Sequence, residues 1–188
     1  MSQRTFIDTN IFIYADDDGS GLKQKRAREV LEQPVRTGNA VISTQVLQEY
    51  FNIATSKLKF TAERARWRVE SLSRYAVVLN DTAILLGAID LHRLHRISIW
   101  DALIVKAASV VHCAVVLSED LNHGQIIDGV RVENPFLPPG RAAEPRARYQ
   151  VMPELQHVAV RPPPGEPKPR TASSTRSTPP QRGSARGR

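Results

Sequence analysis

Five short apolar stretches alternate with longer helical segments along the first 137 residues, and this alternation limits the fold more than any other feature. The predicted strands are residues 4–8, 40–43, 76–79, 114–118 and 130–134. The predicted helices are residues 22–33, 44–58, 62–74, 83–94 and 99–111. Stretches such as 76–79 are apolar throughout, which is typical of strands covered by helices on both faces. The order predicts an α/β domain with a central parallel β-sheet flanked by α-helices.

The boundaries of these helices rest on capping residues and on proline. Pro34 is predicted to stop the first helix at residue 33, because proline lacks a backbone donor. The other predicted helix starts carry a side chain suited to an N-cap; these caps are Ser43, Thr61, Asp81 or Thr82, and Ser98. Asp128 and Gly129 are predicted to form a hairpin turn before the last strand.

The composition changes after residue 137. Residues 138–188 contain 11 of the 13 prolines, and nine arginines and one lysine against three glutamates, so this segment carries the whole net charge of +7. We interpret it as a disordered basic tail rich in proline, arginine and serine, following a domain of residues 1–137. Such a tail suits salt-sensitive contact with phosphates, and a solubilising extension explains it equally well.

Three classes of protein are disfavoured. The single cysteine, Cys113, cannot form an internal disulfide or a cysteine-rich zinc site. No apolar run approaches the roughly 18 residues of a membrane span. The first ten residues lack a basic segment followed by an apolar one, so no signal peptide is expected. We therefore expect a cytoplasmic protein.

An aspartate interrupts the first apolar stretch. Asp8 follows Phe6-Ile7, and the apolar run 11–14 then reads as more buried strand. A buried carboxylate is costly unless something pairs with it. Ligands of parallel sheets bind beyond the carboxyl ends of the strands. Asp8 and Asp120, which follows the strand 114–118, are therefore expected at the same edge of the sheet.

Two further acids lie on predicted helices. Glu49 shares a narrow polar face with Gln45, so an exposed surface position explains it well. Asp101 comes three residues after Ser98, where a carboxylate suits a capping box and the helix dipole. The apolar helix that follows Asp101 indicates burial, which would place this carboxylate at a cleft.

Taken together, these acids indicate a metal site. Asp8, Glu49, Asp101 and Asp120 come from four different elements. Like charges brought close raise each other's pKa, so a cluster of four needs cations. Oxygen ligands favour Mg²⁺ or Mn²⁺. Two such ions about 4 Å apart could clamp a phosphodiester and activate water.

Four segments also carry a family resemblance. They read FIDTNIFIYA at 6–15, STQVLQEYFNIAT at 43–55, SIWDALIVKAA at 98–108 and LSEDLNHGQIIDGVRVENPF at 117–136. In this order they resemble the PIN-domain ribonucleases, and among these the VapC-like toxins of type II toxin–antitoxin systems. The similarity covers about residues 4–137.

The resemblance implies a PIN fold and an endoribonuclease that hydrolyses RNA by metal-activated water. It carries catalytic and metal-binding roles, for Mg²⁺ or Mn²⁺, onto Asp8, Glu49, Asp101 and Asp120. It implies that Asn10 and Ser118 support the site by hydrogen bonds. By resemblance we also expect a homodimer, a cognate antitoxin, an RNA substrate and no membrane partner.

Other interpretations remain open. The chain could be a non-catalytic PIN-like module that binds RNA or protein. It could also be an aspartate-dependent phosphatase, although such enzymes usually carry a second aspartate where this chain has Asn10. Since residues 1–137 hold equal numbers of acidic and basic side chains, phosphate attraction would depend on the tail or on local basic residues; these are Lys57, Lys59, Arg64, Arg66 and Arg68.

Overall fold

The computed structural model describes residues 3–138 of the chain. The predicted tail therefore lies outside the described residues, apart from Pro138. The strands are β1 Thr5–Ile7, β2 Ala40–Ser43, β3 Ala76–Val78, β4 Val115–Leu117, β5 Ile126–Ile127 and β6 Val130–Glu133. The helices are α1 Thr9–Asp16, α2 Leu22–Arg36, α3 Thr44–Ser56, α4 Ala62–Leu72, α5 Thr82–His95 and α6 Ile99–Val110.

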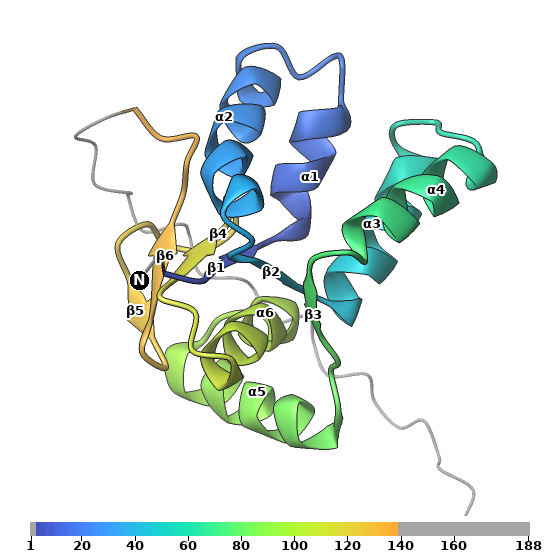
Figure 1. Ribbon diagram of the computed structural model, residues 1–188. Helices are drawn as coiled ribbons and strands as arrows, with labels where there is room; N and C mark the ends of the chain where they lie inside the picture. The colour runs from blue at the N-terminus through green and yellow to red at the C-terminus, as the bar shows by residue number, and fades with distance from the viewer. Residues whose placement is uncertain (1–2, 139–188) are drawn as a thin grey trace, which may run out of the picture. The chain divides into compact units, whose positions relative to one another are not determined.

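The strands form one sheet in the order β3-β2-β1-β4-β6-β5. Every neighbouring pair is parallel except β5 and β6, which pair antiparallel at one edge. Figure 1 shows α1 and α2 on one side of the sheet and α5 and α6 on the other, with α3 and α4 beside α1. The predicted parallel α/β architecture is confirmed.

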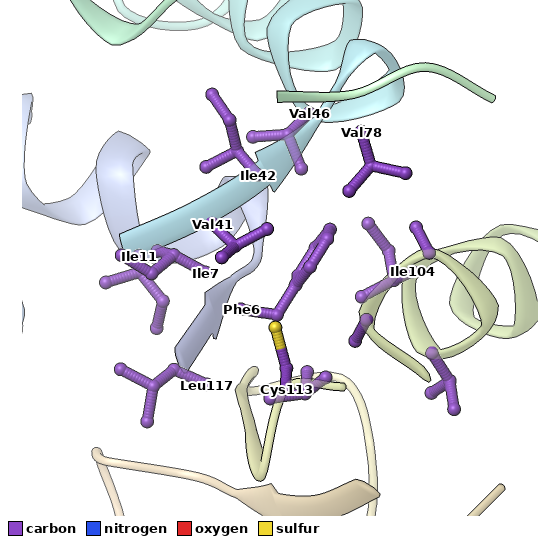
Figure 2. Packing of buried hydrophobic residues seen from close by; sticks show 14 of the residues in the cluster. Phe6, Ile7, Ile11, Val41, Ile42, Val46, Val78, Ile104, Cys113 and Leu117 are labelled. Atoms are coloured by element: carbon purple, nitrogen blue, oxygen red, sulfur yellow. The ribbon is translucent and has the colours of Figure 1, made fainter. Parts of the chain in front are cut away.

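The central strand β1 anchors the core. Phe6 and Ile7 are fully buried, and they point to opposite faces because side chains alternate along a strand. Figure 2 shows Phe6 directed toward Ile104 of α6, while Ile7 lies with Ile11 and Leu117. Burying one such side chain contributes about 1.5–3 kcal/mol. This packing on both faces fixes where the chain emerges at Asp8.

Two elements differ from the sequence-based prediction. The prediction of extended chain after Asp8 is wrong, because α1 begins at Thr9 with Asp8 as its N-cap. The prediction that Pro34 stops the first helix is also wrong, since α2 continues to Arg36. Pro34 lies in the last turn, where the helix loses only one hydrogen bond. The short strand β5 was not predicted.

The predicted caps are confirmed at four helices. The side chains of Ser43, Thr61, Asp81 and Ser98 each accept a hydrogen bond from a backbone N–H in the first turn. The predicted turn is also confirmed, because Asp128 and Gly129 join β5 to β6 with φ of 49° and 79°.

The end of α6 closes with a left-handed residue. His112 has a φ of 56°. Its N–H donates to Ser109 O at 2.9 Å, and the next N–H, of Cys113, donates to Ala108 O at 3.0 Å. This is the Schellman pattern, in which glycine is the usual residue at the left-handed position.

None of the helices in the part of the chain that the structure describes is both long enough and apolar enough to cross a membrane.

Candidate functional site

The candidate site begins where β1 and β4 end side by side. Ile7 is in register with Leu117, so Asp8 and Ser118 follow at the same edge of the sheet. Ser118 Oγ donates to Asp8 Oδ2 at 2.6 Å, and the Asp8 N–H donates to Leu117 O at 3.1 Å. The prediction that the acids after these two strands share one edge is confirmed.

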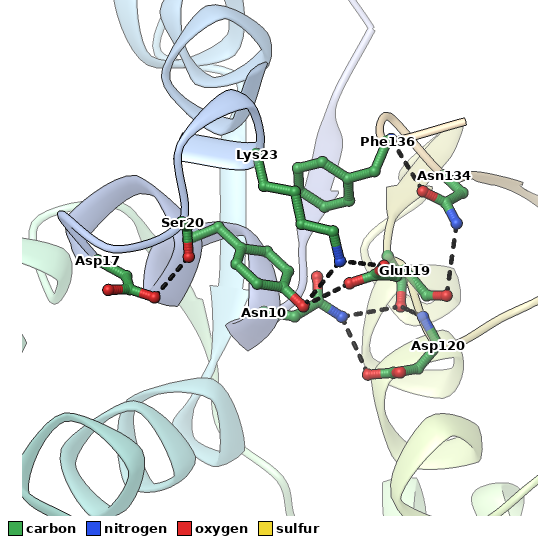
Figure 3. Close-up of polar contacts among 10 residues, drawn as sticks. Asn10, Asp17, Ser20, Lys23, Glu119, Asp120, Asn134 and Phe136 are labelled. Atoms are coloured by element: carbon green, nitrogen blue, oxygen red, sulfur yellow. Dashed lines mark hydrogen bonds and ion pairs between the residues drawn. The ribbon is translucent and has the colours of Figure 1, made fainter. Parts of the chain in front are cut away.

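Asn10 links the two carboxylates at this edge. Its Nδ2 donates to Asp8 Oδ2 at 2.9 Å and to Asp120 Oδ2 at 3.1 Å. Figure 3 shows Asn10 from α1 facing Asp120. The Asp120 N–H in turn donates to Ser118 Oγ at 3.1 Å. Asn10 and Ser118, predicted as supporting residues, therefore lie between Asp8 and Asp120.

Glu49 reaches the same edge from α3. Thr9 Oγ1 donates to Glu49 Oε2 at 2.9 Å, and Gln45 Nε2 donates to Glu49 Oε1 at 2.7 Å. Gln45 is itself buried, and its Nε2 also donates to Trp100 O at 3.2 Å. Glu49 is half-buried and fixed toward the start of α1, so the alternative of a solvated surface glutamate does not describe it.

Asp101 lies in the first turn of α6. Ser98 Oγ donates to Asp101 Oδ2 at 2.7 Å, and the Asp101 N–H donates to Ser98 Oγ at 3.0 Å. The predicted capping arrangement is therefore present. Burial raises the pKa of Asp101, and the negative charges of Asp120 and Glu49 raise this pKa further. These charges place Asp101 within electrostatic range of the other acids.

A cavity of about 730 Å³ opens at this edge. Asp8, Glu49 and Asp120 line it together; Asp101 is not part of the lining, although the charges of Asp120 and Glu49 act on it. The cavity extends past Tyr14 along α1 to the aspartates at the end of that helix.

The electrostatics of the cavity centre on Asp8. Its side chain is 7% exposed. Burial raises the pKa of Asp8 to about 7, and the nearby charges of Asp120 and Glu49 also raise it, while hydrogen bonds from Ser118 and Thr9 oppose the shift. A cation in the cavity would therefore stabilise the ionised form of Asp8.

The atoms of the cavity that could coordinate a metal ion fit Mg²⁺ or Mn²⁺, because all the negatively charged ones are carboxylate oxygens. Asn10 Oδ1 adds a buried acceptor without a hydrogen-bond partner among the described residues. Within residues 3–138, no set of three acidic, histidine or cysteine side chains already lies ready to hold an ion. Asp8, Glu49 and Asp101 each accept hydrogen bonds from protein donors in this structure.

Residues that sequence reasoning missed hold the Asp120 segment in place. Glu119 accepts a hydrogen bond from the Tyr14 hydroxyl at 2.6 Å and forms an ion pair with Lys23 at 2.5 Å. Phe136 packs edge-on against the Tyr14 ring, with 5.0 Å between the centroids. These contacts fasten the Ser118–Asp120 segment to α1 and α2. Nothing in the sequence signals them, because about 100 residues separate the partners.

Replacing Lys23 with methionine should lower the free energy of unfolding by about 1 kcal/mol, because the Glu119 carboxylate is only 18% exposed and loses its cation. Urea unfolding measures the change. Arg66→Met is the control, since Arg66 pairs with Glu70 on the open surface and should cost about 0.3 kcal/mol or less. Equal losses in the two variants would contradict this role of Lys23.

The fold and the site define the chain as an α/β protein with an acid-lined cavity at the carboxyl edge of a parallel sheet. The sequence model of the PIN domain matches residues 5–127. The chain therefore belongs to the PIN domain family.

Solved structures with the same fold include toxin–antitoxin proteins. VapBC from Salmonella typhimurium, solved bound to DNA, is 25% identical with a TM-score of 0.52, covering 71% of this chain and 99% of that one. A toxin–antitoxin complex from Klebsiella pneumoniae is 22% identical with a TM-score of 0.53, covering 70% and 98%. A sarcin-ricin loop cleaving toxin from Mycobacterium tuberculosis is 14% identical with a TM-score of 0.50, covering 62% and 91%. No curated protein matches the sequence significantly.

Proposed function

We propose that this chain is a metal-dependent endoribonuclease and the toxin of a toxin–antitoxin pair. The observation that carries the proposal is the meeting of Asp8, Glu49 and Asp120 around one cavity of a PIN domain, with Asp101 beside them. A bare cluster of this kind is electrostatically unfavourable, and divalent cations would balance it and would attract the anionic phosphodiester.

In the proposed site the four acids bind the metal and neighbouring polar side chains orient them. Asp8, Glu49, Asp101 and Asp120 would hold Mg²⁺ or Mn²⁺. A bound divalent ion supplies a water of lowered pKa and neutralises charge on the phosphate. Asn10 and Ser118 orient Asp8 and Asp120 by the hydrogen bonds described above. Thr9 and Gln45 orient Glu49 in the same way.

The biological role rests on the structural neighbours. The similarity to VapBC from Salmonella typhimurium, over 71% of this chain, supports a toxin with a protein antitoxin as its partner. RNA as substrate and a homodimer belong to the same proposal. The phosphatase alternative is weaker, because Asn10 uses its amide to link Asp8 with Asp120 and offers no second acid.

We expect the purified chain to cleave single-stranded RNA in Mn²⁺ and to lose this activity when a chelator is added, because the proposed water needs the ion. Gel analysis of the RNA fragments measures both reactions. Induced expression should also arrest growth, and Asp101→Ala should relieve the arrest. Cleavage that persists in chelator, or an arrest that Asp101→Ala does not relieve, would contradict the proposal.

A further inference from the structure

One wall of the cavity is formed by α1 and the acidic residues at its end. A second wall, formed by α3, α4 and the loop between them, also carries positive charge. Lys57 and Arg64 line this wall with Phe60 between them in the sequence. Both cations are exposed, and neither forms an ion pair or a side-chain hydrogen bond within the part of the chain that the structure describes. Two unpaired cations inside an acid-rich cavity are therefore open to an anionic ligand.

The aspartates across the cavity are already satisfied by the protein. Asp16 Oδ2 accepts from Arg68 and from Tyr50, each at 2.7 Å. Asp17 accepts from Ser20 Oγ, as Figure 3 shows. Asp18 accepts from Gln24 Nε2 at 3.0 Å. Their negative charges would repel a phosphate chain, and this confines such a chain to the wall of α3 and α4.

Arg64 is held in one place by the ring beneath it. Its guanidinium lies 3.6 Å from the centroid of the Phe60 ring, which is the geometry of a cation–π contact. The half-buried Phe60 packs against the hydrophobic core, so it is a firm support. Phe60 covers one face of the guanidinium, and within residues 3–138 the guanidinium N–H groups of Arg64 donate to no acceptor. A base can stack on such a plane while the N–H groups contact phosphate.

We propose that Lys57, Phe60 and Arg64 form a subsite for single-stranded RNA. Lys57 and Arg64 contact backbone phosphates, and the stacked pair of Phe60 and Arg64 takes an unpaired base. Because the bases of a duplex are already stacked on each other, the subsite favours unpaired RNA. The inference rests on the proposed function and adds the residues that hold the strand and its path across the cavity.

Binding of a short, labelled single-stranded oligouridylate to the full chain, in chelator, tests the subsite without cleavage. We expect Lys57→Gln with Arg64→Gln to weaken binding on the order of 10-fold to 100-fold and to reduce the salt slope by about one for each cation removed. Phe60→Leu should weaken binding of the single strand by about 10-fold and change duplex binding less. Thermal melting of each variant checks that the domain stays folded.

Arg66→Gln is the control, because Arg66 lies on α4 but outside this cavity; it removes one positive charge, half of what the double variant removes. It should alter RNA affinity by less than about 2-fold. An equal loss in the control would overturn the subsite in favour of diffuse attraction. Unchanged RNA affinity in the double variant would also overturn it.

Different experimental results would contradict the subsite and the proposed function. A chain that binds RNA through Lys57 and Arg64 but does not cleave it in Mn²⁺ contradicts the nuclease function and leaves the subsite standing. A chain that cleaves RNA in Mn²⁺ with the same KM and kcat in the double variant contradicts the subsite alone.

Discussion

Replacing Asp8 with asparagine should lower Mn²⁺-dependent RNA cleavage by about 10³-fold while the domain stays folded, because loss of a metal ligand removes several kcal/mol of transition-state stabilisation. The asparagine keeps an acceptor for the Thr9 N–H, so the cap of α1 is retained. The rate of RNA cleavage and the melting temperature are the two measurements. Activity within about 10-fold of wild type would contradict the proposed role of Asp8.

The same substitution should change the pH dependence of stability when no metal is present. Burial raises the pKa of Asp8 to about 7 from 3.8. Between these values the folded chain holds a proton that the unfolded chain has released, so stability falls as the pH rises through this window. The contribution is fully present below the lower value and lost above the higher one, and it amounts to at most about 4 kcal/mol.

Urea unfolding in chelator, at about pH 5 and about pH 8, measures this effect. The wild type should lose stability over this range, and Asp8→Asn should lose less because its side chain does not ionise. Asp101, whose pKa burial also raises, accounts for part of the remaining slope. An equal slope in both proteins would contradict the electrostatic account of Asp8.

Asp16→Ala should lower the free energy of unfolding by about 2–4 kcal/mol. The buried Tyr50 hydroxyl and the Arg68 Nε both donate to Asp16 Oδ2 at 2.7 Å, so the substitution leaves a hydroxyl and a cation without their acceptor. This contact also joins α3 and α4 to the end of α1, and its loss should loosen the second wall of the cavity. Urea unfolding measures the free energy.

Asp18→Ala is the control for this substitution, because Asp18 is exposed and, among the described residues, accepts a side-chain hydrogen bond only from Gln24. Its cost should stay within about 0.5 kcal/mol. If both substitutions cost the same, Asp16 is not the link between these helices.

The sequence predicted the elements whose signals are local. Ser43, Thr61 and Ser98 bond to amides three residues away, so short patterns were sufficient. The shared edge of Asp8 and Asp120 followed from the rule that parallel strands end together. The helix α1 was not predictable in this way, because it follows β1 without a turn and four apolar residues do not separate a helix from a strand.

The contacts that organise the site depend on distances between remote residues. Periodicity placed Glu49 and Gln45 on one face, but it did not show that Gln45 would be buried against Trp100 O. The link from Asp16 to Arg68 and the link from Lys23 to Glu119 join residues 52 and 96 positions apart. Such pairings follow from the packing of helices on the sheet and carry no local sequence signal. The tail, the dimer and the antitoxin stay predictions.

The stability of this fold can be raised at the left-handed residue after α6. His112 holds a conformation in which a β-carbon costs about 1 kcal/mol, and the hydrogen bonds that close the helix there come from the backbone. His112 precedes β4, whereas Ser118 and Asp120 follow it, so the two positions lie at opposite ends of that strand. A single glycine at His112 is therefore a route to a more heat-resistant protein that leaves every charge around the cavity unchanged.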